Sequence, residues 1–142
     1  RSGIMPSIST TMVTGAASGI GQAIAIRAAQ DGHRVACVDI RDQTDTLDRI
    51  QATNGKATGH AFNLRDAEAV RKLFADVEDS YGGPDILINS AAIFERGTLE
   101  TTTEELWDRH LAINLKAPFL LCQAFARQME PDRHGHIINI AD

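Results

Sequence analysis

Three glycines near the amino terminus, in the sequence TGAASGIG at positions 14–21, have the spacing of a turn that binds phosphate groups. Gly15 permits a tight turn, and Gly19 has no side chain to block the approach of a pyrophosphate. Gly21 is expected to let the following helix pack closely on a sheet. The free N–H groups at the positive end of that helix would bind the diphosphate. The candidate binding residues here are Gly15, Ser18, Gly19, Ile20 and Gly21.

Such glycines also occur in βα turns that bind nothing, and an acidic residue further along decides between the two readings. Asp39 ends the second apolar run, where a carboxylate can accept hydrogen bonds from the adenosine ribose and repel a 2′-phosphate. Ile40 offers no cation for that phosphate, so NAD is favoured over NADP. The alternative is a solvated Asp at a strand end. Arg41 would weaken the preference for NAD if its side chain turned back.

Short apolar runs alternate with segments of helical period along the chain. The expected strands are residues 11–14, 34–39, 58–63, 85–89 and 136–141, and the expected helices are 20–30, 43–53, 66–81 and 103–129. Strict alternation predicts an α/β fold with a doubly wound, Rossmann-like parallel sheet in three α/β/α layers. We expect a single domain over residues 1–142, with 1–7 as an added or flexible end and the sheet breaking off after its fifth strand.

The residues between the runs include helix caps and helix stops that agree with this assignment of strands and helices. Asp66 is placed to cap the third helix, and Thr102 with Glu105 predicts a capping box at the start of the fourth. Gly82-Gly83-Pro84 should end the third helix. The first strand, residues 9–13, fits less well, because it is more polar than a central parallel strand usually is.

In order and spacing these segments resemble the short-chain dehydrogenase/reductase family from about Ser9 to the last residue. Thr-Gly-x-x-x-Gly-x-Gly is similar to that family's form of the glycine turn. The resemblance implies that Asp39 binds ribose and that Asn63-Leu64 lies against the adenine, where the family usually has Asp-Val. The tetrapeptide at 89–92, Asn-Ser-Ala-Ala, is similar to the family's Asn-Asn-Ala-Gly, and implies a backbone beside the ribose. The further binding candidates are Asn63, Leu64, Asn89 and Ala91.

The resemblance also implies two catalytic positions. Asn114 falls on the family's catalytic asparagine, and Pro118 gives a physical reason beside the resemblance. Because proline has no N–H, the carbonyl of Asn114 loses its helical partner and could hold the water of a proton relay. The alternative is an Asn at a helix kink, packed or solvated. Asp142 falls where the family commonly has the Ser that polarises the substrate carbonyl; Asp occurs there in the pteridine reductase branch, or could be an accident of where the sequence stops.

The family's proton donor is a Tyr whose pKa is lowered by a Lys four residues later. The chain has one Tyr, Tyr81, and Asp85 stands four residues after it. We therefore expect the 142-residue chain alone to be inactive, and to be part of a longer enzyme rather than a truncated relative. An apolar stripe on the fourth helix would lack a packing partner, which favours a homodimer or homotetramer through that helix. The stripe is Leu111, Leu115, Phe119, Leu120 and Ala124.

Composition narrows the partners. The net charge is −5, without a basic run, which argues against nucleic acid or an anionic membrane as a partner. No window is apolar enough to span a bilayer. Cys37 and Cys122 form no CxxC and are expected to be reduced, as in a cytoplasmic protein. The histidines lack metal-ligand spacing, so no metal site is expected. His110 shares a helix face with Asn114 and either approaches the site or packs.

The leading hypothesis is an NAD-dependent dehydrogenase or reductase that transfers a hydride between nicotinamide and a small alcohol/carbonyl substrate. One alternative is a pteridine-reductase-like enzyme that uses Asp142 at the Ser position. Another is a non-catalytic dinucleotide-binding protein that reports redox state. All three share the glycine turn and Asp39.

Overall fold

Five parallel strands form one sheet in the computed structural model, which describes residues 7–129, 131 and 133–141. In the order of the sheet they are β3 (Lys56–Ala61), β2 (Arg34–Asp39), β1 (Thr10–Thr14), β4 (Ile86–Asn89) and β5 (His136–Asn139). The chain builds outward from β1 through β2 to β3, then returns to the other side of β1 with β4 and β5. In sheets of this kind a ligand crevice opens at the carboxyl ends of the strands where the order reverses. Here that point lies between β1 and β4.

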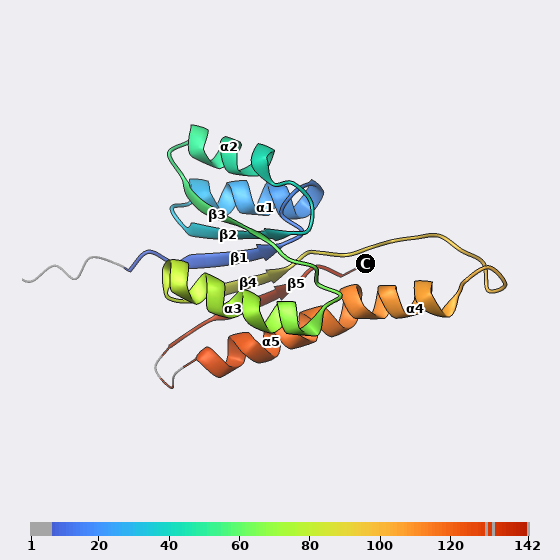
Figure 1. Ribbon diagram of the computed structural model, residues 1–142. Helices are drawn as coiled ribbons and strands as arrows, with labels where there is room; N and C mark the ends of the chain where they lie inside the picture. Colours follow the sequence, from blue (N-terminus) through green and yellow to red (C-terminus); the bar gives the residue numbers. More distant parts are fainter. Residues whose placement is uncertain (1–6, 130, 132, 142) are drawn as a thin grey trace, which may run out of the picture.

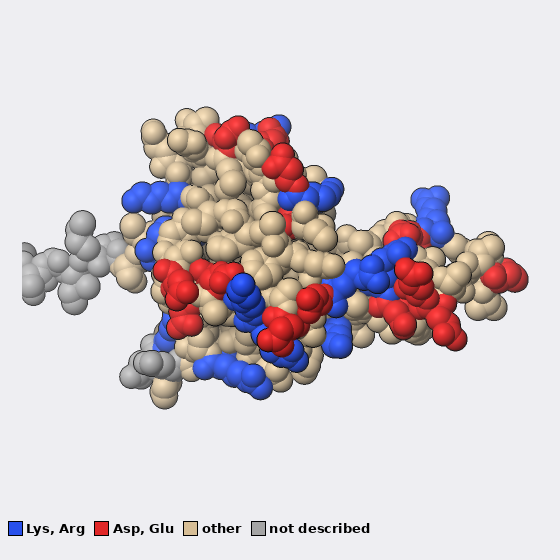
Figure 2. Space-filling model, viewed as in Figure 1, with Lys and Arg blue, Asp and Glu red and all other residues tan. Residues whose placement is uncertain are grey.

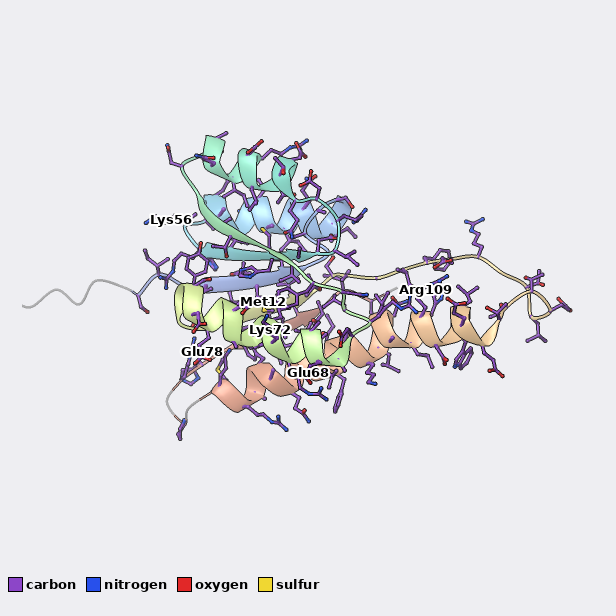
Figure 3. All side chains as sticks on the ribbon, viewed as in Figure 1. Met12, Lys56, Glu68, Lys72, Glu78 and Arg109 are labelled. Carbon is purple, nitrogen blue, oxygen red and sulfur yellow. The ribbon has the colours of Figure 1, made fainter. Side chains whose placement is uncertain are left out.

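Helices cover both faces of the sheet (Figure 1). On one face lie α1 (Gly19–Gln30) and α2 (Thr44–Ala52), and on the other α3 (Ala67–Tyr81) and α5 (Ala117–Gln128). The first face has a core around Val13 and Ile50. The second has a core around Met12, Leu73 and Leu121, and Figure 3 shows Met12 in the layer where α3 crosses the sheet. The predicted doubly wound, three-layer α/β/α fold is confirmed.

The single long helix predicted at 103–129 consists of three parts: α4 (Glu104–Leu111), a π-helical turn η1 (Ala112–Lys116) and α5. In η1 the hydrogen bonds run five residues back, as from the N–H of Ala117 to the carbonyl of Ala112. Pro118 follows directly and cannot donate to the residue four before it. The expected disturbance at Asn114 therefore exists, and it takes the form of a π turn, one of the recognised ways to interrupt a helix.

α4 and the segment that leads into it project beyond the sheet (Figure 1). Residues 90–103 run outward from the end of β4 and return into α4, which has no fully buried residue. On the face seen in Figure 2, acidic and basic side chains lie close together over this projecting part. We call residues 90–103 the arm.

Two buried threonines account for part of the polarity of the first strand. The hydroxyl of Thr14 accepts hydrogen bonds from the N–H groups of Ser90 and Ala91, at 3.1 and 3.0 Å. The hydroxyl of Thr11 pairs with the ring of His33 at 2.7 Å. These side chains fasten the central strand to the segments at its two ends, so their polarity costs little on burial.

The ends of α3 are as the sequence predicts. The carboxylate of Asp66 accepts from the N–H groups of Glu68 and Ala69, at 2.9 and 3.3 Å. Gly82 ends the helix in the left-handed region, with φ of 79°. Tyr81, the last helical residue, lies under the guanidinium of Arg34, 5.2 Å from ring centre to Cζ. It acts here as a packing residue.

The predicted capping box at the fourth helix is wrong by one residue. The hydroxyl of Thr103, not that of Thr102, accepts from the N–H of Leu106, at 3.2 Å. Thr102 instead donates to the carbonyl of Thr98, at 2.7 Å, and so belongs to the turn before the helix. The Thr-rich run offers several possible caps, and the conformation of that turn selects among them.

No helix within the described ranges combines the length and apolarity needed to cross a membrane. Residues 1–6 of the expected added or flexible end lie outside the described residues. That expectation, and the assignment of the chain to a single domain, stay predictions.

Candidate dinucleotide-binding site

The glycine turn joins β1 to α1, and its backbone explains two of the three glycines directly. Gly15 has φ of 71°, and a Cβ there would lie 2.9 Å from the backbone of Ala91. The turn is thus pressed against the segment that follows β4. A Cβ on Gly21 would collide with the carbonyl of Gly15. The sequence assigned Gly21 to packing of the helix on the sheet, whereas in the structure it lets the helix pack on the turn itself.

Gly19 is different, because it faces open space. It has φ of 58°, and among the described residues no atom lies within 4 Å of a Cβ placed there. Ser18, just before it, is extended and makes no side-chain capping bond to α1. A bare helix N-terminus beside an unobstructed glycine is the arrangement into which a pyrophosphate fits.

A cavity of about 880 Å³ opens beside this turn. That volume lies in the range of sites for small organic ligands and cofactors. The sequence-predicted residues that line it are Gly15, Ser18, Ile20, Gly21, Asp39, Ile40, Asn63, Leu64 and Ala91. Two other predicted residues, Gly19 and Asn89, are not in its wall. The structure therefore brings most of the candidate binding residues together at one place, the carboxyl ends of the strands.

Asp39 ends β2 and is only 6% exposed. One carboxylate oxygen accepts from the N–H of Ala17 in the glycine turn, at 3.0 Å, and the other from the N–H of Arg41, at 2.9 Å. These bonds hold the carboxylate in the cavity wall next to the turn. The alternative of a solvated strand-end Asp is wrong.

The side chain of Arg41 turns back over Asp39. Its Nε lies 3.4 Å from an oxygen of Asp39, and one terminal nitrogen donates to the hydroxyl of Ser18, at 2.8 Å. The guanidinium is largely exposed, so the pair is screened by solvent. A positive charge thus lies between the glycine turn and the carboxylate of Asp39. This is the arrangement that the sequence left open as a weakness in the preference for NAD.

The wall beyond β3 contains the predicted Asn63 and Leu64 together with two residues that the sequence did not indicate, Phe62 and Arg65. The amide oxygen of Asn63 accepts from the N–H of Arg65, at 3.0 Å, which fixes the turn after the strand. Phe62 also lines the cavity and packs against the core under α3. In sequence Phe62 looks like an ordinary strand-end core residue, so nothing marks it as part of a site.

Asn89 acts between secondary-structure elements instead of lining the cavity. It is buried, and its amide donates to the side-chain oxygen of Asn139 at 2.9 Å and to the sulfur of Cys122 at 3.5 Å. It thereby joins β4 to β5 and α5. Ala91, two residues further, does line the cavity, and its N–H is held by Thr14.

Asn114 lies in η1, and its side chain is used by the backbone of the arm. Its amide oxygen accepts from the N–H of Ile93, and its amide nitrogen donates to the carbonyl of Ile93, both at 2.9 Å. Asn114 itself is not in the cavity wall, but Ile93 and Ile113 are. The predicted water-holding role of its carbonyl stays a prediction. Asp142 lies outside the described residues, and so its predicted role also stays a prediction.

The apolar end of the cavity was not found from the sequence. Ile93, Ile113 and Ile140 line it. Each could as well be a core residue from its type and position, and only the fold brings the three segments to one wall.

The buried Cys37 is not a candidate nucleophile. Burial raises the pKa of the Cys37 thiol to about 12, which keeps it protonated and unreactive. Both cysteines are free. Across the described ranges, no cluster of three or more His, Cys, Asp or Glu side chains could hold a metal ion.

Known proteins match this chain over nearly its whole length. The family model for short chain dehydrogenases matches residues 9–141. A D-threitol dehydrogenase of Mycolicibacterium smegmatis is 39% identical over 132 residues, covering 92% of this chain and 51% of the relative. A 3-oxoacyl-[acyl-carrier-protein] reductase of Thermotoga maritima is 33% identical, covering 92% and 54%. The crystal structure of a metagenomic short-chain oxidoreductase in complex with NADP has a TM-score of 0.88 at 37% identity, covering 94% of this chain and 62% of that one.

The TM-score shows that this chain shares the fold of that structure. The chain spans about half the length of the curated relatives that it matches. On the family match over residues 9–141, the chain belongs to the short-chain dehydrogenase family.

Proposed function

We propose that the protein is an NAD-dependent oxidoreductase that transfers a hydride between nicotinamide and a small alcohol/carbonyl substrate. The observation that carries the proposal is the cavity of about 880 Å³ whose wall combines the glycine turn with the carboxylate of Asp39. The relatives support the reaction class, since one is named a D-threitol dehydrogenase and another a 3-oxoacyl-[acyl-carrier-protein] reductase. When bound, the nicotinamide ring would donate or accept the hydride.

The chain's own residues would bind and orient the dinucleotide. The open backbone at Gly19 and the first turn of α1 would receive the diphosphate. Asp39 would accept from the ribose hydroxyls, and Asn63 and Leu64 would meet the adenine edge. Asn114 would hold the proton-relay water at its carbonyl. Each role follows from position in or beside one cavity.

The preference for NAD rests on competition between two charges. Asp39 is buried and fixed by two N–H donors, so a 2′-phosphate beside it would meet the negative charge of its carboxylate. Arg41 reaches the same place but is already shared with Asp39 and Ser18. A 2′-phosphate would have to displace Arg41 from Asp39 to be neutralised. We therefore expect NAD to bind more tightly, with Arg41 narrowing the difference. The related structure with NADP bound shows that the same fold accommodates the phosphorylated cofactor in another protein.

Titration of the protein with NADH and with NADPH, followed by nicotinamide fluorescence, tests the proposal. NADH should bind more tightly than NADPH. Asp39→Ala should reduce the difference in binding free energy between the two cofactors by about 1–3 kcal/mol, the scale of a close like-charge contact. Arg41→Ala should increase that difference. Asp31→Ala, which removes an exposed carboxylate paired with Arg27, is the matched control and should leave both affinities unchanged. Equal affinities in the unmodified protein would reject the NAD assignment, and binding of neither would reject the site.

A second part of the proposal is self-association through the fourth helix. Leu115 and Phe119 are 65% and 60% exposed, and Leu111 lies on the same side. Leu120 and Ala124, expected in the same stripe, instead pack against the core under α3. We propose that a second copy of the chain covers the exposed three. Sedimentation of the unmodified chain and of the Leu115→Glu/Phe119→Glu variant tests this, since the variant should be monomeric and the unmodified chain should not.

A further inference from the structure

His110 joins the arm to α4 through both nitrogens of its ring. Nδ1 lies 2.9 Å from the carbonyl oxygen of Leu106, one turn earlier in the helix. Nε2 accepts from the backbone N–H of Glu95, at 3.1 Å. One turn later, Asn114 makes its two bonds to the backbone of Ile93. One edge of the helix thus holds alternate residues of the arm, 93 and 95, by their main chain.

The two partners of His110 determine where its proton lies. A backbone carbonyl can only accept, so Nδ1 must carry the hydrogen. A backbone N–H can only donate, so Nε2 must be free to accept. Only the neutral, Nδ1–H form of the ring satisfies both. A second proton on Nε2 would face the N–H of Glu95 and break that bond.

The charged groups around this contact pair with one another. Arg109 donates to the carboxylate of Glu95, at 2.7 Å, and approaches that of Glu105, at 3.9 Å. In Figure 3 Arg109 lies on the side of α4 that faces the outgoing segment of the arm. The carboxylate of Glu95 is therefore engaged by Arg109, and the contact of His110 is with its backbone N–H. Glu95 is therefore held by two independent interactions, the ion pair of its carboxylate with Arg109 and the hydrogen bond of its backbone N–H with His110.

Part of the fastened segment lines the cavity. Ala92 and Ile93 are in the cavity wall, and so is Ile113, which lies between His110 and Asn114 in the chain. Movement of residues 93–95 away from the helix would displace this part of the wall. The position of the wall thus depends on contacts made outside the cavity.

We propose that His110 is a positioning residue that, in its neutral Nδ1–H form, holds residues 93–95 against α4, and with them the cavity-lining Ile93, and that it releases them when it is protonated. The inference rests on the proposed function, because it assigns dinucleotide binding as the property that His110 controls. It predicts that acid weakens cofactor binding through a group that never touches the cofactor. Histidine is the side chain whose charge ordinarily changes between pH 5 and 8.

The first test is the protonation state of the ring itself, which does not require cofactor. Nitrogen-15 NMR of the full chain, with His110 assigned through His110→Gln, distinguishes the two neutral tautomers. The expected result at pH 8 is a protonated Nδ1 and an unprotonated Nε2. An Nε2–H tautomer would overturn the proposal. Because this readout is independent of NADH, it separates failure of the contact from failure of the proposed function.

The second test is NADH affinity between pH 5.5 and 8 for the unmodified chain and three variants. His110→Ala should weaken binding about three- to tenfold at pH 8, the effect of one lost hydrogen bond. His110→Gln, whose amide oxygen can accept from Glu95 without titrating, should bind within about twofold of the unmodified chain at pH 8 and lose the decline of affinity in acid. Glu95→Gln keeps the backbone N–H and loses only the ion pair, so it should keep the acid decline.

His60→Gln is the matched histidine control, because β3 places that ring at the far edge of the sheet. Its affinity profile should follow that of the unmodified chain. An unchanged affinity in His110→Ala, or an acid decline that persists in His110→Gln, would reject the proposal. A merely structural role would lower affinity in both His110 variants at every pH alike.

Discussion

β1 and β5 belong to the same sheet and are separated only by β4, yet they lie in opposite surroundings. Every residue of β1 is buried, and every residue of β5 is exposed. The helices differ in the same way, because α1 and α5 each have three buried residues while the projecting α4 has none. We call the part around β1, whose residues are buried, the closed side, and the part around β5 and α4, whose residues are largely exposed, the open side.

The elements around β1 and β2 carry the glycine turn and Asp39, which would bind the dinucleotide. The predicted catalytic residue Asn114 lies on the open side, beside the arm. Dense packing holds ligand-binding groups in one position. Exposed apolar surface, in contrast, is free to contact another protein surface. Binding and catalysis are thus expected to respond differently to the same kind of substitution.

The sharpest way to break this comparison is to truncate one apolar side chain on each side. Leu87 in β4 is fully buried in the core under α3, so Leu87→Ala should lower the free energy of unfolding by about 2–5 kcal/mol. Ile138 in β5 is half exposed, and Ile138→Ala should cost about 1 kcal/mol or less. Urea denaturation of both variants measures the two values. Equal costs would mean that β5 is as well packed as the centre of the sheet.

A second comparison lies within the glycine turn. Gly21→Ala places a methyl against the carbonyl of Gly15 and should destabilise the fold by about 3 kcal/mol, at the upper end for overpacking. Gly19→Val meets open space and carries only the strain of a left-handed residue, about 1–2 kcal/mol, but should abolish NADH binding. Thermal unfolding and a cofactor titration on the same samples separate the effects. Retained affinity in Gly19→Val would mean that the turn is only structural.

On the open side, Asn114→Ala should loosen the arm while sparing the sheet. It removes two hydrogen bonds to the backbone of Ile93, a loss of about 1–3 kcal/mol in local stability. Hydrogen exchange should then be faster at Ile93 and unchanged at Val38 in β2. Exchange that accelerates equally at both amides would show that the arm and the sheet open together.

The smallest expected effect is the contribution of His60, in the edge strand β3, to the pH dependence of stability. Burial lowers the pKa of His60 below its ordinary value of 6.5, although Asp76 acts in the opposite direction. The folded state therefore binds fewer protons than the unfolded state, and stability present above pH 6.5 is lost as the pH falls through that value. His60→Gln should reduce the slope of stability against pH between 5 and 7. Denaturation midpoints that fall equally in both proteins would assign the slope to other groups.

Much of the fold could be predicted from the sequence because its signals are local. Alternating apolar runs and helical segments identify the strands and helices, and the cap at Asp66 and the stop at Gly82 depend on neighbouring residues only. The same locality makes the glycine turn and Asp39 recognisable. Each of these features is specified by residue types at fixed spacing, so no tertiary contact is needed to find it.

The rest depends on tertiary contacts. The contacts of the Asn89 amide with Asn139 and Cys122 are known only from the structure, and its predicted place beside the cofactor stays a prediction. The return of Arg41 over Asp39 is a side-chain conformation, and sequence could only mark it as possible. The wall formed by Ile93 joins segments that meet only after folding. Residues of this kind carry no signal in type or spacing.

The π turn between α4 and α5 has a consequence for how the two helices are set. Successive residues of an α-helix advance by about 100° around the axis, so one surplus residue changes the phase of everything beyond it. α5 can therefore turn Leu121 and Phe125 toward the core while α4 turns a different edge toward the arm. Deleting one residue from Ala112–Lys116 would restore a continuous helix and rotate His110 away from Glu95. The number of residues in the π turn therefore sets how far α4 is rotated relative to α5 about the helix axis.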